Sequence, residues 1–372
     1  MSSQNIHKMD RKELQSGQDI KAKMEFGLKK EMGLKLSALE IDELEQINIR
    51  IEARLNDKRK LLEAPFADLP PLPPALPDYR DWITVAKPSE KDFVSWCSDG
   101  KIDAVERYVE ERKDQPSEIP LRRGLAAACQ DGRAQVARYL LQKGAQLYGY
   151  AVECACRRSD LALFEVFIEH GWHPNQQVPS IGGNFGVALL HCTGNPQIVR
   201  FLLAHGADPN LGPFIPGCPD FGHTPPMDRR SGAALTAAAR SHNMEVIDLL
   251  LEYGAKVEWA AMPLHRALST PDRWPERRPV FIRFLELGAD PNKPTPFRHG
   301  NMWDFGAPIQ WAIGYENWDA VELLLRAGAI TGPGNAFSHL AGGPMARVEA
   351  ESKLEALQAI VNKENQEKSD SS

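Results

Sequence analysis

The chain of 372 residues lacks the features that mark membrane, secreted and nucleic-acid-binding proteins. It contains no run of about 18 apolar residues, so it has no ordinary transmembrane helix. Its first residues do not contain the apolar stretch of a signal peptide. Lys and Arg total 44, Asp and Glu total 50, and the net charge of -6 is too small to indicate nucleic acid or a membrane as the partner. We therefore expect a cytoplasmic or nuclear protein with no membrane contact.

Cysteine is scarce, and the six cysteines are spread along the chain. Cys97, Cys129 and Cys156 stand where a helix presents small residues to its neighbours. This usage is typical of buried, reduced thiols in an intracellular protein and excludes a disulfide framework.

The sequence also offers little for catalysis. Cys154 and Cys156 with His170 and His173 are the residues most similar to a metal site. His191-Cys192 is the most similar to a thiol nucleophile, and Gly182-Gly183-Asn184 to a phosphate-binding loop. The first group is divided among different structural elements, the thiol has no orienting Asn or Asp in a recognisable context, and the glycine segment lacks the lysine of a phosphate loop. We expect no catalytic residue, no cofactor and no bound metal.

What the sequence does contain is a repeated helical pattern, clearest over residues 197–210. Its apolar residues lie on one face of a helix: Ile198, Val199, Leu202 and Leu203. Gly206 then supplies the left-handed residue that ends a helix, and Pro209 prevents a restart. The same pattern ends at five other glycines: Gly144, Gly171, Gly254, Gly288 and Gly328. Self-similarity of this kind predicts a stacked solenoid, in which Leu250 and Leu251 are buried between repeats.

Each copy begins with a short helix rich in small residues, such as Ala238-Ala239. The segment Met262-Pro263-Leu264-His265-Arg266-Ala267, together with the Gly-Ala-Asp-Pro-Asn endings, resembles the ankyrin repeat. The resemblance covers roughly residues 92–332 and implies an all-α ankyrin-repeat solenoid of about six repeats with hairpin or loop fingers. It also implies a scaffold for protein–protein interaction, in which His265 ties adjacent repeats together. Three turn positions depart from the expected glycine: Ser159, His242 and Glu316.

The other parts of the chain flank this array, which we place at residues 88–343. Residues 1–64 form a charged helical arm, in which Ser37 and Glu40 make a capping box for a main helix over 37–63. Its apolar stripe either docks on the repeats or mediates self-association as a coiled coil. Residues 65–87 are a proline-rich linker, interpreted as a spacer in preference to a polyproline ligand because no flanking arginine completes such a ligand. A capping helix over 344–362 and a disordered tail over 363–372 complete the chain.

The spacing of the repeats is irregular. From Gly206 to Gly254 there are 48 residues, from Gly288 to Gly328 there are 40, and from Gly144 to Gly171 only 27. The two long intervals predict extended fingers over 211–232 and 293–306. A further insertion is predicted as a loop between two helices over 269–279.

A binding surface is predicted on the concave side of the array, where inner-helix residues next to the small ones point away from the stack. These positions hold Arg157, Arg158, Arg240, Arg266, Trp311 and Tyr315, and the long fingers add Phe214, Phe221, Phe297, Trp303 and Phe305. Arginine and large aromatic residues dominate binding energy at protein interfaces. We predict a groove for an acidic or aromatic-anchored protein segment, with removal of Arg240, Arg266 or Trp311 weakening binding but not stability. Two alternatives stay open. The chain can instead be read as a regulatory subunit whose Arg-rich concave face binds an acidic, phosphorylated or nucleic-acid ligand, and the finger aromatics as residues that pack on one another.

Overall fold

The fold is known from a computed structural model, which describes residues 49, 53, 55–77, 90–115, 120–180, 183–213, 226–294, 306–331 and 343–370. The chain divides into two compact units, of which the first comprises residues 1–71 and 214–226. In this unit residues 55–63 are helical, and the short 3₁₀ helix η1 (Ala64–Phe66) follows with Pro65 in it. The predicted helix start at Ser37 lies outside the described residues.

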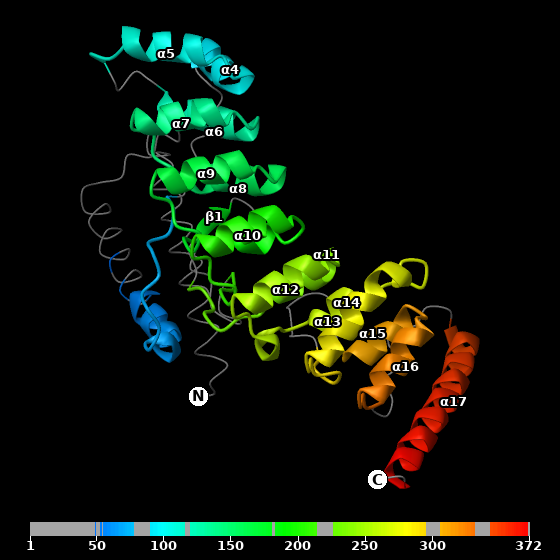
Figure 1. The fold of residues 1–372 in the computed structure, drawn as a ribbon. Helices are drawn as coiled ribbons and strands as arrows, with labels where there is room; N and C mark the ends of the chain where they lie inside the picture. Colours follow the sequence, from blue (N-terminus) through cyan, green and yellow to red (C-terminus); the bar gives the residue numbers. More distant parts are fainter. Residues whose placement is uncertain are drawn as a thin grey trace, which may run out of the picture. The chain divides into compact units, whose positions relative to one another are not determined.

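The second unit, residues 72–213 and 227–372, is a series of helix pairs that stack in chain order (Figure 1). The inner members are α4 (Lys91–Asp99), α6 (Leu121–Gln130), α8 (Gly149–Arg158), η5 (Ala188–His191), α11 (Ala233–Ser241), α13 (Pro263–Ala267) and α15 (Pro308–Gly314). The outer members are α5 (Ile102–Glu111), α7 (Ala134–Gln142), α9 (Leu161–Glu169), α10 (Pro196–Ala204), α12 (Met244–Glu252), α14 (Trp274–Glu286) and α16 (Trp318–Arg326). Each inner helix contacts the inner helix of the next pair, as a solenoid requires.

The core of this unit lies between the pairs. Small inner-helix residues such as Ala238 have no exposed surface, and Leu250 of the outer helix α12 is likewise fully buried. The prediction that Leu251 is buried was wrong, because Leu251 is only half-buried, and Leu249 is buried instead, at 4% exposure. The helix is therefore rotated by part of a turn from the orientation that the leucine pair suggested.

The glycine endings behave as the sequence predicted. Gly144, Gly171, Gly206, Gly254, Gly288 and Gly328 all have φ between +80° and +94°. In each case two backbone bonds close the outer helix; Gly206 N donates to Leu203 O at 3.0 Å and Ala207 N to Leu202 O at 2.9 Å. Only glycine adopts this conformation without steric cost, which explains why it ends these six pairs. The first pair ends at Arg112, which has a negative φ.

An asparagine after the glycine joins one repeat to the next, a role that the sequence analysis did not identify. Asn210 Nδ2 donates to Gly254 O, and Asn210 Oδ1 accepts from Lys256 N, both at 3.0 Å. Asn175 and Asn292 make the same two bonds to the repeats that follow them. Each amide group thus satisfies one donor and one acceptor of the following turn.

The three turns without glycine keep the glycine conformation. Ser159, His242 and Glu316 have φ of 54°, 46° and 55°, close to the 78° of Gly100 and the 70° of Gly132. The surrounding helices therefore impose the turn on residues that disfavour it.

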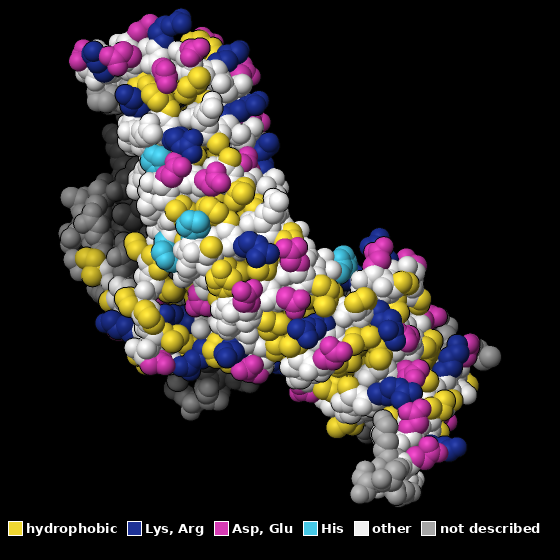
Figure 2. All heavy atoms as spheres, in the orientation of Figure 1, with side chains coloured by type: hydrophobic (Ala, Val, Ile, Leu, Met, Phe, Trp, Pro, Cys, Tyr) yellow, Lys and Arg dark blue, Asp and Glu magenta, His cyan; other side chains and the backbone are white. Residues whose placement is uncertain are grey.

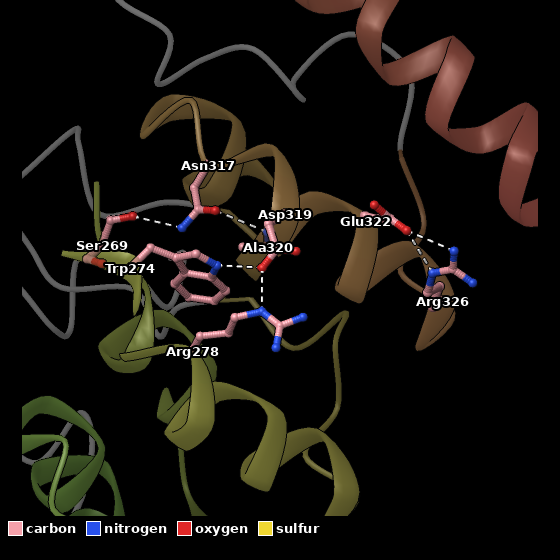
Figure 3. A network of polar contacts seen from close by, with 8 residues as sticks. All are labelled: Ser269, Trp274, Arg278, Asn317, Asp319, Ala320, Glu322 and Arg326. Carbon is pink, nitrogen blue, oxygen red and sulfur yellow. Dashed lines mark hydrogen bonds and ion pairs between the residues drawn. The ribbon is translucent and has the colours of Figure 1, made fainter. Parts of the chain in front are cut away.

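The predicted loop over 269–279 is shorter than expected, because α14 begins at Trp274 and contains Pro279. Trp274 Nε1 and Arg278 Nε both donate to Asp319 Oδ2, at 2.6 and 2.7 Å (Figure 3). In the same network Asn317 Nδ2 donates to the backbone of Ser269 at 3.1 Å. Residues that the sequence placed in an exposed loop thus join α14 to α16.

The C-terminal helix α17 (Gly343–Asp370) is longer than predicted and includes most of the segment expected to be a disordered tail. It packs against α16 and buries Ala350, Leu354 and Val361. Arg326 of α16 pairs with Glu364 of α17. The ion pair lies beyond the predicted helix end at residue 362, so the cap extends along α16 past that point.

A short finger follows the third pair, where β1 (Val178–Ser180) runs antiparallel to β2 (Gly183–Gly186) with Val178 opposite Gly186. The 3₁₀ helix η6 (Val257–Trp259) occupies a later connection. The structure is otherwise helical or irregular in the parts described, which confirms the all-α class. No described helix is both long enough and apolar enough to cross a bilayer.

Candidate partner-binding surface

The predicted surface rests on the inner helices, which form a row because each contacts the next. Arg157 and Arg158 end α8, Arg240 lies near the end of α11, and Arg266 lies in α13; all four side chains are exposed. Small residues beside them are buried. The four arginines are therefore exposed side chains of the inner helices, and a common binding face for them stays a prediction.

The two arginines of α8 have local partners. Arg157 lies 3.4 Å from a carboxylate oxygen of Glu153, one helical turn earlier, and its guanidinium is 5.5 Å from the ring centroid of Tyr150. Arg158 Nη1 donates to the backbone oxygen of Gln130 at 3.2 Å, which links α8 to α6. The sequence signal for the first pair was the i, i+4 spacing of Glu and Arg, which the sequence analysis did not use.

Arg240 and Arg266 differ from these two. Neither side chain forms an ion pair or hydrogen bond with a residue that the structure describes, and both are exposed. The backbone of Arg266 is fixed, because Arg277 Nη1 donates to its carbonyl at 3.0 Å and to that of Leu268 at 3.3 Å. The surface thus presents two charges on rigid helices with no described counter-charge.

Trp311 and Tyr315 of α15 lie further along the row, and both are only half-buried. The Trp311 ring packs edge-on against His265 at 5.7 Å and against Tyr315 at 6.2 Å. His265 Nε2 bonds to the carbonyl of Gly306 at 3.0 Å, which confirms that this histidine ties adjacent repeats. Trp311 therefore contributes to packing between repeats, and its removal is expected to lower stability, contrary to the expectation from sequence.

Charge on the outer helices is arranged differently. Several arginines there pair across repeats: Arg138 with Glu169 at 2.8 Å, Arg200 with Glu245 at 3.0 Å and Arg283 with Asp248 at 3.2 Å. Figure 2 shows basic and acidic side chains interspersed over this face. Paired surface charges offer little net attraction to a charged ligand.

The predicted finger aromatics, Phe214, Phe221, Phe297, Trp303 and Phe305, all lie outside the described residues. Their contribution to the surface stays a prediction.

The cysteines and histidines that resembled parts of a chemical site have structural surroundings in the described chain. Burial raises the pKa of the Cys97 thiol to about 12 and also raises the pKa values of Cys129, Cys154 and Cys156. Thiols with raised pKa values are poor nucleophiles and poor metal ligands. His170 Nδ1 contacts the Val166 carbonyl at 2.8 Å, on an outer helix. In the described part of the chain no three His, Cys, Asp or Glu side chains gather as a metal site would require.

Comparison with known proteins gives one family. The family model of the ankyrin repeat matches residues 187–212, which include η5, α10 and the asparagine Asn210. No curated protein matches the sequence. Among solved structures, the human ASB11 ankyrin repeat domain is 17% identical, covers 72% of this chain and 98% of its own, and has a TM-score of 0.34. The ankyrin repeat domain of Bcl-3, of the IkappaB protein family, is 20% identical, covers 57% and 89%, and has a TM-score of 0.37.

Proposed function

Because the chain is an ankyrin repeat protein, we propose that it is a non-catalytic scaffold or adaptor that binds an acidic segment of a partner protein along its inner helices. One observation carries this proposal: Arg240 and Arg266 are exposed on the inner-helix face with no described counter-charge, while arginines of the outer helices are paired across repeats.

The physical reason is that an unpaired arginine on a rigid helix gains most when a partner supplies the carboxylate. Such a bond is charge-assisted and can be bidentate, and little side-chain order is lost because the backbone is already fixed. Arg158, which within the described residues bonds only to a backbone carbonyl, extends the positive charge toward α6. Trp311 and Tyr315 provide an aromatic edge at the other end of the row. A segment with carboxylates and an aromatic anchor would complement this surface.

The test compares three chains: the wild type, an Arg240→Ala/Arg266→Ala double variant, and Arg200→Ala as a control. Arg200 is also an exposed arginine, but it lies on an outer helix and is paired with Glu245. Partners captured by the wild type are identified by mass spectrometry, and the dissociation constant of each is measured against all three chains.

We expect the double variant to lose at least tenfold in affinity at an unchanged melting temperature, which corresponds to roughly 1.4 kcal/mol. The control should bind like the wild type. Unchanged affinity in the double variant would move the site away from this surface. A log–log salt dependence steep enough to indicate several released counterions would instead favour a phosphorylated or nucleic-acid ligand for the same arginines.

A further inference from the structure

The proline-rich segment Leu72–Pro77 is not a free spacer, because it is seated on the repeat array. The Leu76 side chain is 6% exposed and belongs to the core of the array, and Leu72 packs partly against that core. Leu76 N donates to Gln177 O at 2.9 Å, and Pro77 O accepts from Gly149 N at 3.2 Å. The segment has neither helix nor strand assignment and lies at the base of the finger formed by β1 and β2.

The site exists because one finger is short. Only 27 residues separate Gly144 from Gly171, against about 33 in a regular ankyrin repeat. The connection before α8 consequently has only the residues 145–148, while the next connection extends to the β1–β2 hairpin. Because the connection before α8 is short, the side of the β1–β2 finger that faces this connection has no neighbouring finger. Leu72–Pro77 occupies this place, and its backbone bonds to Gln177 before β1 and to Gly149 of α8.

The place that Leu72–Pro77 occupies, called the slot from here on, is walled mainly by backbone. A Cβ on Gly149 would lie 2.7 Å from the carbonyl oxygen of Pro179, so the first turn of α8 and strand β1 are too close for any side chain there. Gln176 adds a side-chain contact, since its Nε2 donates to Pro74 O at 3.0 Å. Recognition through main-chain bonds and a leucine pocket selects an extended shape and an apolar anchor more than a particular sequence.

We propose that this slot is a binding site for extended, proline-flanked partner segments with two leucines four residues apart, and that the chain's own Leu72–Pro77 occupies it as an internal ligand. Prolines favour the extended conformation before binding and so reduce the entropy lost on docking. The internal copy competes at the millimolar effective concentration of a tethered segment, so the partner must make further contacts to displace it. This slot is independent of the inner-helix arginines.

The experiment uses the full chain and a fluorescent peptide of residues 70–78. In the Leu76→Asp variant the internal copy loses its buried anchor, and we expect the peptide to bind this variant at least tenfold more tightly than the wild type. The control variant is Leu61→Asp, at a leucine that is 75% exposed, and it should bind like the wild type. A peptide with alanine at both leucine positions should bind neither chain. Equal affinity for wild type and Leu76→Asp, or binding to neither, would overturn the proposal.

A second measurement does not depend on the folding of a variant. In the wild type, excess peptide should accelerate hydrogen exchange at the Leu76 amide at least tenfold and leave the Gly149 amide protected, because the peptide replaces the internal copy. Leu76 exchange that is unchanged by the peptide would show that the segment is a fixed part of the fold. Concentration-dependent dimers that disappear in Leu76→Asp would assign the slot to exchange between two copies of the chain and overturn the assignment to a partner.

Discussion

At the residue scale, the turns between helices show the array holding side chains in a conformation that favours glycine. Glu316 has φ of 55°, and Gly132, at the equivalent turn of an earlier pair, has φ of 70°. A left-handed non-glycine residue costs about 1–2 kcal/mol. The sequence identified these positions as departures from the pattern. It could not show that the chain keeps the turn, because φ there is set by how α15 and α16 pack against each other.

Replacement of Glu316 by glycine should therefore stabilise the array. We expect a gain of about 0.5–1 kcal/mol, since relief of strain is partly offset by the greater freedom of glycine in the unfolded chain. The urea midpoint measures it. Gly254→Ala makes the reverse change, from glycine to a residue with a side chain, at another left-handed position. Nothing lies within 4 Å of an added Cβ there, so the loss of stability reports backbone strain alone. If Glu316→Gly lowered the midpoint, the left-handed turn would not be strained.

At the element scale, the sequence predicted the helix pairs well because their signals are local. Apolar spacing and the ending glycines fix where each outer helix lies. Two errors have physical causes. Pro279 was taken as a boundary, but α14 tolerates it within its second turn. The polar segment after residue 362 was taken as disordered, yet it continues α17, where Lys363 lies 3.9 Å from Glu367 at i, i+4 spacing.

Burial at neighbouring positions of α12 provides a graded test. Leu250→Ala should cost about 2–5 kcal/mol, because a fully buried leucine loses its contacts and leaves a cavity. Leu251→Ala should cost clearly less, since that side chain is only half-buried. Hydrogen exchange should show the damage from Leu250→Ala spreading to adjacent repeats, because each repeat stabilises its neighbours. Damage confined to α11 and α12 would contradict this coupling.

At the scale of the whole molecule, the sequence could not place contacts between distant segments. The bond from Gln176 to Pro74 joins residues 102 apart, and no periodicity reports such a pairing. The candidate surface was easier, because exposed arginines recur on the short inner helices; Arg157 and Arg240 stand at the same position, two residues before the left-handed residue of the turn. Ion pairs between repeats could not be predicted. Within the described residues Arg200 meets a carboxylate of the next repeat and Arg240 does not, and this difference depends on the neighbouring repeat.

The asparagine bridges also have a mechanical consequence. Asn175, Asn210 and Asn292 each clasp the following repeat through two bonds. The ending after Gly254 carries no asparagine at this position and is joined to the next ending by Lys293, whose Nζ donates to the carbonyls of Glu258 and Ala260 at 3.3 and 2.8 Å. Under tension along the stack, a junction with both asparagine bonds should therefore resist parting more than the same junction without them. Optical-trap extension should show that substitution of Asn210 by alanine lowers the force of one step. Rupture in single repeats of equal strength would show that the clasps do not set the order in which the array gives way.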